Sequence, residues 1–210
     1  TWTKLSDSSF TSLSITSDRS MITAGGKNGT LALIFPYQSG TDEISLVNVP
    51  NPSDITSLWI DKVGASVSVI AAFSDNTLSY TKNLLTTYPN WVSINTAQLV
   101  APIKRIAASE SSGAIHGMLL KENNQAVNFS VNLSNSTLAL GSTLSGSYTD
   151  ISEGDNYFYL TLANGQLARK DKIATTTVTA LGGLPFNANL LSVKGTEFLS
   201  CRDSTYVKSG

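Results

Sequence analysis

The sequence predicts an all-β protein built from five repeats, and three recurring features support this prediction. Short turn signals recur along the chain, an apolar run precedes each of them, and a strand-like segment follows each. The turn pairs are Asn28-Gly29, Asp75-Asn76, Asn123-Asn124, Asn164-Gly165 and Asp203-Ser204. Asn, Asp and Gly tolerate the positive φ of tight hairpins, so each pair predicts a turn between two antiparallel strands. The first residues of successive pairs are 47, 48, 41 and 39 residues apart.

Each repeat contains four segments that have the composition of strands. The first segments are small and β-branched, at 10–16, 55–61, 103–109, 148–154 and 189–195. The second are the apolar runs before the turns, at 20–25, 67–73, 115–120, 157–162 and 197–201. The third follow the turns and begin at Thr30, Thr77, Ala126, Gln166 and Thr205. The fourth are looser, at 42–49, 90–100, 136–144 and 175–183. Helix signals are poor, because no capping box leads into a sustained apolar period of 3.6 residues.

Several of the second segments, such as "VSVIAAF" at 67–73, do not alternate between apolar and polar residues. A strand covered on both faces can be apolar throughout. Short four-stranded sheets covered on both faces are typical of the blades of a β-propeller. We therefore expect a five-bladed β-propeller in one domain, residues 1–210. A plain two-sheet sandwich is the alternative. The expected blades are residues 10–50, 54–100, 102–145, 147–185, and 187–210 together with 1–9.

The fifth repeat lacks a fourth segment, and the chain begins with an orphan strand-like segment, "TWTKLSDSS". Its Trp2 resembles Trp91, which opens the fourth segment of the second repeat. We expect residues 1–9 to pair with the strand at 205–209, so that they complete the fifth blade and close the ring.

Composition restricts the partners. Lys and Arg number 14 against 15 Asp and Glu, which gives a formal net charge of -1. Because no basic stripe is available to neutralise phosphates, nucleic acid is not an expected partner. No apolar run approaches the roughly 18 residues of a membrane span. The first residues lack the charged and then apolar pattern of a signal peptide, so we expect them to belong to the domain. The single cysteine, Cys201, excludes an internal disulfide. The low charge suits an extracellular or virion-surface protein. We also expect the domain to be part of a larger, multi-domain or multivalent assembly.

No catalytic motif emerges. His116 is the only histidine, so a metal triad of histidines is excluded, and no nucleophile elbow occurs. A glycan hydrolase would need converging carboxylates, and the candidates are Asp54, Asp61, Asp150, Glu153, Asp155 and Asp171. We expect no enzyme and no cofactor, apart from a structural calcium ion for which Glu153 and Asp155 could offer oxygens.

Binding residues are expected in the loops. In a propeller, the turns between second and third strands share one rim with the loops that join successive blades. The rim then carries Lys27 and the candidate ligand-binding residues Asn28, Asn51, Asp54, Asp75, Asn76, Asn123, Asn124, Asn164, Asn187, Arg202 and Asp203. Trp59, Tyr37, Tyr80 and Tyr88 are candidate aromatic platforms for sugar rings; the alternative is that they pack between blades.

The units "NGTL", "DNTL" and "NGQL" resemble the hairpin of tachylectin-type five-bladed propellers. The Ser-, Thr- and Asn-rich repeats are also similar to the receptor-binding heads of viral and phage spikes. These resemblances imply a non-enzymatic domain that binds a cell-surface glycan or receptor, as a virion attachment head. The alternatives are a secreted tachylectin-type lectin, a glycan hydrolase and a propeller that docks other proteins, which a broad exposed apolar patch would mark.

Overall fold

The structure is a computed structural model of the whole chain. It describes residues 9–35, 43–63, 65–95, 101–111, 113–135, 137–173, 177–183, 190–194, 197–201 and 205–209. The chain divides into two compact units, Thr1–Ile103 and Lys104–Gly210, and each has its own sheets and core. Among the described residues, no helix has the length and apolarity needed to cross a bilayer.

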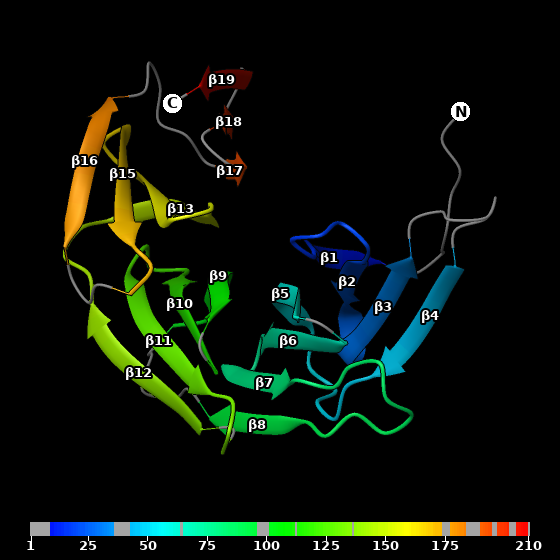
Figure 1. The fold of residues 1–210 in the computed structure, drawn as a ribbon. Helices are drawn as coiled ribbons and strands as arrows, with labels where there is room; N and C mark the ends of the chain where they lie inside the picture. Colours follow the sequence, from blue (N-terminus) through cyan, green and yellow to red (C-terminus); the bar gives the residue numbers. More distant parts are fainter. Residues whose placement is uncertain are drawn as a thin grey trace. The chain divides into compact units, whose positions relative to one another are not determined.

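The first unit contains two antiparallel sheets of four strands each (Figure 1). In each sheet the strands lie in chain order, so consecutive strands are hydrogen-bonded neighbours. The first sheet consists of β1 (Phe10–Ile15), β2 (Ile22–Gly26), β3 (Thr30–Phe35) and β4 (Glu43–Asn48), with a single 3-10 turn, η1 (Lys27–Gly29), between β2 and β3. The second sheet consists of β5 (Ile55–Val63), β6 (Ser66–Phe73), β7 (Thr77–Thr81) and β8 (Val92–Asn95).

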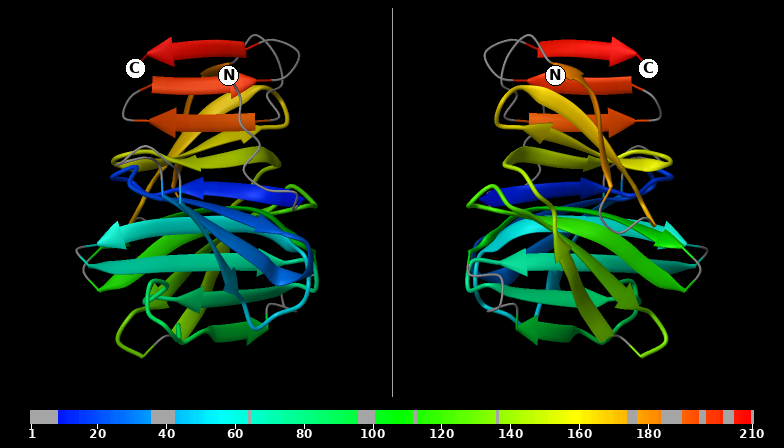
Figure 2. Two further views of the ribbon diagram at one scale, coloured as in Figure 1. Left: turned by 90° about the vertical axis from the view of Figure 1, so that its right-hand side faces the viewer. Right: turned by 90° about the vertical axis from the view of Figure 1, so that its left-hand side faces the viewer.

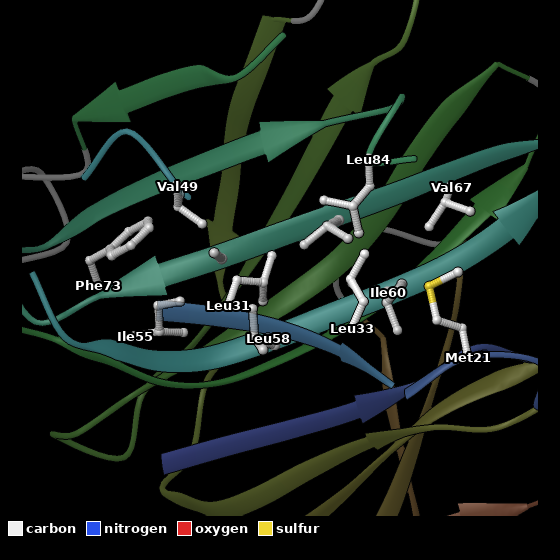
Figure 3. Close-up of a cluster of buried hydrophobic side chains, with 12 residues drawn as sticks. Met21, Leu31, Leu33, Val49, Ile55, Leu58, Ile60, Val67, Phe73 and Leu84 are labelled. Carbon is white, nitrogen blue, oxygen red and sulfur yellow. The ribbon is translucent and has the colours of Figure 1, made fainter. Parts of the chain in front are cut away.

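The two sheets of the first unit enclose an apolar core. Leu31 and Leu33 of β3 point at the second sheet, and Ile55, Leu58 and Phe73 meet them from the other side (Figure 3). The alternation along β3 decides which residues take part, because successive side chains of a strand point to opposite faces. The second sheet supplies an almost continuous apolar strand: seven of the eight residues of β6 are buried.

Threonines near the start of the first strand of each sheet tie this unit together. The hydroxyl of Thr11 donates to the carbonyl oxygens of Gly25, at 3.2 Å, and of Ile55. The hydroxyl of Thr56 donates in the same way to Ala72 and Ile103, at 3.3 and 2.8 Å. Both threonines sit where the register with the neighbouring strand shifts. The irregular backbone is therefore satisfied by a side chain at the same position of both repeats in this unit.

The second unit contains three antiparallel sheets, two of four strands and one of three. The strands of the four-stranded sheets are β9 (Ile103–Ser111, which begins at the last residue of the first unit), β10 (Ala114–Lys121), β11 (Ala126–Asn132) and β12 (Thr137–Thr143), then β13 (Tyr148–Glu153), β14 (Tyr157–Leu162), β15 (Gln166–Asp171) and β16 (Val178–Gly183). The three-stranded sheet consists of β17 (Leu190–Lys194), β18 (Glu197–Cys201) and β19 (Thr205–Ser209). Figure 2 shows the alternating directions of β17, β18 and β19.

The first two sheets of the second unit share an apolar core of the same kind. Met118 and Leu120 of β10 pack with Ile151 of β13 and with Phe158 and Leu160 of β14. All five side chains are fully buried. Burying side chains of this size stabilises the fold by about 1.5–3 kcal/mol each.

The hairpin turns have the backbone that the sequence predicts. Asn28, Asn76 and Asn124 have φ values of 55°, 64° and 64°, and Gly165 has 80°. In three hairpins the amide of this residue donates to the carbonyl three residues earlier, at 3.0–3.1 Å. These are type I turns followed by a left-handed residue. The predicted all-β fold and four-stranded repeats are therefore confirmed in four sheets, whereas the expected strand at residues 1–9 falls outside the described residues, except Ser9.

Candidate functional site

The predicted rim loops do come together in the first unit. The backbone amide of Asn28 donates to the carboxylate of Asp54 at 3.0 Å. The side-chain amide of Asn51 donates to the carboxylate of Asp75 at 3.0 Å and to the hydroxyl of Thr77 at 2.6 Å. The turn after β2, the loop before β5 and the turn after β6 thus form one hydrogen-bonded cluster. These side chains hold the loops to one another, which leaves less of their hydrogen-bonding capacity for a ligand.

Asp75 shows the electrostatic consequence of this cluster. Partial burial alone would raise the pKa of its carboxyl, but hydrogen bonds from Thr77 and Asn51 outweigh burial. The pKa of Asp75 is therefore lowered from its ordinary value of 3.8. A carboxylate held in this way is a stable loop constraint, because the bonds that lower its pKa favour the ionised form.

We predict that Asp75→Asn removes part of the acid sensitivity of the fold. A carboxyl whose pKa is lower in the folded chain stabilises it above pH 3.8, the ordinary value, and this contribution disappears as pH falls through the folded pKa. Urea midpoints at about pH 6 should fall in the variant by the equivalent of at most about 1 kcal/mol, because the site is exposed. The difference between the two proteins should shrink as pH falls below 3.8; a deficit of constant size from about pH 6 to about pH 2 would contradict the assignment.

In the second unit the predicted rim residues also serve the turns. The carbonyl oxygen of Asn124 accepts the amide of Tyr148 at 2.8 Å, and the side-chain oxygens of Asn123 and Asn164 accept amides two residues further on, at 3.3 and 3.1 Å. Asn76, in the first unit, takes the left-handed turn position. The remaining rim candidates, Asn187, Arg202 and Asp203, lie outside the described residues.

The aromatic platforms require a correction. Trp59 and Tyr80 are 5% and 2% exposed, so neither can present a ring face to a ligand. Trp59 lies on β5 and Tyr80 on β7, and the register places both on one face of this sheet through Ile70. Tyr88, in the connection between β7 and β8, is 89% exposed and fits the role by position. Tyr37 lies outside the described residues.

Tyr88 borders an open groove in the first unit. The groove has a volume of about 840 Å³ and lies between β3 and β4 on one side and the β7–β8 connection on the other. Its defining residues are Phe35, Leu46, Val47, Leu85, Tyr88 and Trp91; we call this the Tyr88 groove. The other lining residues are Leu, Val, Pro, Ser and Thr, so no charged side chain lines it. Leu46 and Leu85 are 64% and 49% exposed.

The β7–β8 connection that forms one wall is long for this chain. It runs from Lys82 to Trp91, ten residues between the bounds of β7 and β8, whereas the equivalent β11–β12 connection has four, Leu133–Ser136. Leu84 anchors it: this side chain is 2% exposed and its amide donates to the carbonyl of Val67 at 3.1 Å. Loops held by a rigid scaffold commonly carry binding function. The sequence "NLLTTYPNW" at 83–91 already indicates an unusually apolar loop. The sequence does not indicate that β4 forms the opposite wall of the groove.

Several of the carboxylates expected for a hydrolase already bind other side chains of the protein. Asp150 is buried and lies 3.6 Å from the guanidinium of Arg105. Asp61 accepts the hydroxyl of Ser17 at 2.7 Å. Within the described part of the chain, no three His, Cys, Asp or Glu side chains gather as a metal site.

The expected calcium ligands have different surroundings. The carboxylate of Glu153 lies 2.7 Å from the ammonium of Lys172, which also donates to Ser109 at 3.1 Å. Asp155 is exposed in the turn before β14. A calcium ion bound to Glu153 would have to displace the ammonium of Lys172.

Comparison with known proteins places the fold. A structure of Saccharomyces cerevisiae Sqt1 is similar over 95% of this chain, with a TM-score of 0.62 and 15% sequence identity. The fold is of the β-propeller class. The match covers 58% of the Sqt1 chain, so this chain spans little more than half of that protein's length. No family model matches the sequence, and no curated protein is similar to it in sequence.

Proposed function

We propose that this β-propeller is a non-enzymatic recognition domain that binds a polypeptide through the Tyr88 groove. The observation that carries the proposal is the uncharged, apolar lining of an open groove beside the exposed ring of Tyr88. Burial of apolar surface drives most association between proteins, and exposed apolar patches commonly mark such contacts. A sugar would need free amides and carboxylates to bind its hydroxyls. In the rim of the first unit, these groups hydrogen-bond to neighbouring loops instead.

A glycan is the second candidate, and the exposed ring of Tyr88 favours it. A sugar ring can stack on such a platform, with Ser45 and Thr87 at the margin of the groove as hydroxyl partners. This candidate requires polar groups that direct the sugar, because an aliphatic wall such as Val47 and Leu85 does not distinguish hydroxyls. The two candidates therefore differ in which ligand class the same groove retains.

The test presents the purified chain to a displayed library of twelve-residue peptides and to a glycan array. We expect enriched peptides, and Tyr88→Ala should lower the affinity of the best of them at least about tenfold, because exposed tyrosines dominate many interfaces. Ile173→Ala is the matched control, since Ile173 is a 75% exposed apolar side chain outside the groove. If the chain binds glycans on the array and enriches no peptide, the ligand of the groove is a carbohydrate and the polypeptide proposal is wrong.

The resemblance to viral and phage spike heads suggests where the protein would act, namely on the surface of a virion. If the chain works on a virion or outside the cell, its polypeptide partner is a host-surface receptor, and several copies together would give firm attachment. Binding of the chain to intact cells, reduced by Tyr88→Ala and by protease treatment of the cells, is the expected result. Cleavage of a glycan by the chain would instead favour the hydrolase alternative.

We also propose that the ring has five blades and that residues 1–9 complete the last one. Support comes from the fifth sheet, which has three strands within the described residues where the others have four. It also comes from the second face of the first sheet, which is apolar: Leu13 and Ile15 of β1 point away from the β5–β8 core and are 68% and 51% exposed. A face of this kind is expected to be covered by another sheet.

A further inference from the structure

The outer strand of the first sheet, β4, has one free edge. The strand order is β1-β2-β3-β4, and β4 pairs with β3 from Glu43 to Asn48. Among the residues that the structure describes, no strand pairs with the other edge of β4. An edge of this kind presents a row of backbone donors and acceptors to any extended chain.

This edge lacks the protection that the other outer strands have. The pairing of β12 with β11 and that of β16 with β15 each contain a register irregularity, and β8 has only four residues. In contrast, β4 keeps an unbroken register through six pairs and contains neither proline nor lysine. Proteins usually blunt exposed edges with bulges, shortness, proline or lysine, so an unprotected edge is consistent with a strand that accepts a partner.

The free edge and the Tyr88 groove are adjacent. Ser45, Leu46 and Val47 of β4 contribute to the wall of the groove, and Leu85 and Tyr88 face them from the β7–β8 connection. An extended peptide that pairs with a strand places every second side chain on the same face. Such a peptide could direct one side chain into the groove while its backbone bonds to β4.

We propose that β4 accepts an extended segment of the polypeptide partner as an additional strand, with an uncharged apolar or aromatic side chain of that segment in the Tyr88 groove. This inference rests on the proposed function, since it names how the same site binds. The uncharged lining selects the side chain, because a charge buried there would lose its hydration without gaining a partner. Addition of a strand at a sheet edge takes its affinity from backbone hydrogen bonds and its specificity from alternate side-chain pockets.

The probe is the best twelve-residue peptide enriched on the intact chain. Backbone N-methylation is introduced at one peptide residue at a time, which removes a hydrogen-bond donor and leaves the side chain unchanged. We expect losses of affinity at alternate residues, of about fivefold or more at each sensitive position. Amide exchange should slow at β4 when the peptide binds, and an unmethylated peptide of scrambled sequence serves as the control.

Each outcome bears on a different claim. In one outcome, Tyr88→Ala weakens binding of the peptide, but N-methylation causes no alternating loss of affinity. This outcome overturns the strand pairing and still supports binding in the Tyr88 groove. Failure to enrich any peptide on the wild-type chain over Tyr88→Ala overturns the proposed function itself. If sedimentation shows a dimer and its formation protects β4, a second copy of the chain replaces the foreign segment and the proposal is wrong.

Discussion

Gly29→Ala is expected to destabilise the chain by about 3 kcal/mol or more, from two separate costs. Gly29 has a φ of +67°, and a Cβ placed on it would lie 2.0 Å from the carbonyl oxygen of Asn51. A left-handed alanine costs about 1–2 kcal/mol. The contact is with backbone, so the loop at Asn51 must also move, and its bonds to Asp75 and Thr77 are then lost. Urea unfolding of the purified chain measures the difference.

Gly113→Ala is the matched control for this experiment. Gly113 also has a positive φ, +78°, but a Cβ placed there would meet nothing within 4 Å. Gly113→Ala should therefore lower the free energy of unfolding only by the cost of a left-handed alanine, about 1–2 kcal/mol. Equal stability of the two variants would contradict the close approach of Gly29 to Asn51. It would also contradict the hydrogen-bonded loop cluster of the first unit.

The close approach also connects the cluster to the Tyr88 groove. Pro50, which precedes Asn51, is part of the groove wall. A displaced Asn51 loop should therefore weaken peptide binding in Gly29→Ala, while Gly113→Ala binds as the wild type does. The amide and carboxylate side chains of these loops would then act on binding indirectly, by fixing the wall of the groove.

The repeats could be predicted from the sequence because their signals are local. Asn76 and Asn124 adopt the left-handed conformation that their turns require, and this preference depends on the residue and its immediate neighbours. The buried strand β6 was recognisable because it is apolar on both faces. A further local signal went unused: Thr11 and Thr56 hold the second position of two first segments, where each bonds to two carbonyl oxygens.

The candidate site could not be predicted in the same way. Trp59 and Tyr80 look like platforms in a sequence, but the exposure of a strand residue depends on long-range packing, and both side chains are buried. The Tyr88 groove combines β4 with a loop some forty residues later, so its walls meet only after the two sheets pack. In the first unit the structure joins Asn28 to Asp54 and Asn51 to Asp75, and a residue pattern does not reveal these pairings.

Deletion of residues 1–9 is expected to have the second large effect. If these residues form the fourth strand of the fifth sheet, their removal loses four or so backbone hydrogen bonds, each contributing about 0.5–1.5 kcal/mol. It would also leave Leu13 and Ile15 of β1 exposed, because the proposed closure would otherwise bury them. We expect a loss of at least about 3 kcal/mol in urea unfolding.

A covalent link can separate strand pairing from a nonspecific effect of truncation. With Cys201 replaced by serine, single cysteines are placed at Thr3 and, in separate variants, at Tyr206, Val207 or Lys208. A disulfide requires Cα atoms within about 7 Å, so only a paired strand should oxidise readily, and one register should be preferred over its neighbours.

The apolar second face of the first sheet is the reason to expect this closure. Leu13, Ala24, Ala32 and Leu46 form one cross-strand row, and Ile15, Ile22, Ile34 and Ile44 form the next. Directly paired residues share a face, so eight apolar side chains lie opposite the face that packs against the second sheet. A closed ring would bury Leu13 and Ile15 and slow the exchange of β1 and β19 amides together. If truncation leaves stability and exchange unchanged, residues 1–9 do not close the fold, and these two rows must be covered by something else.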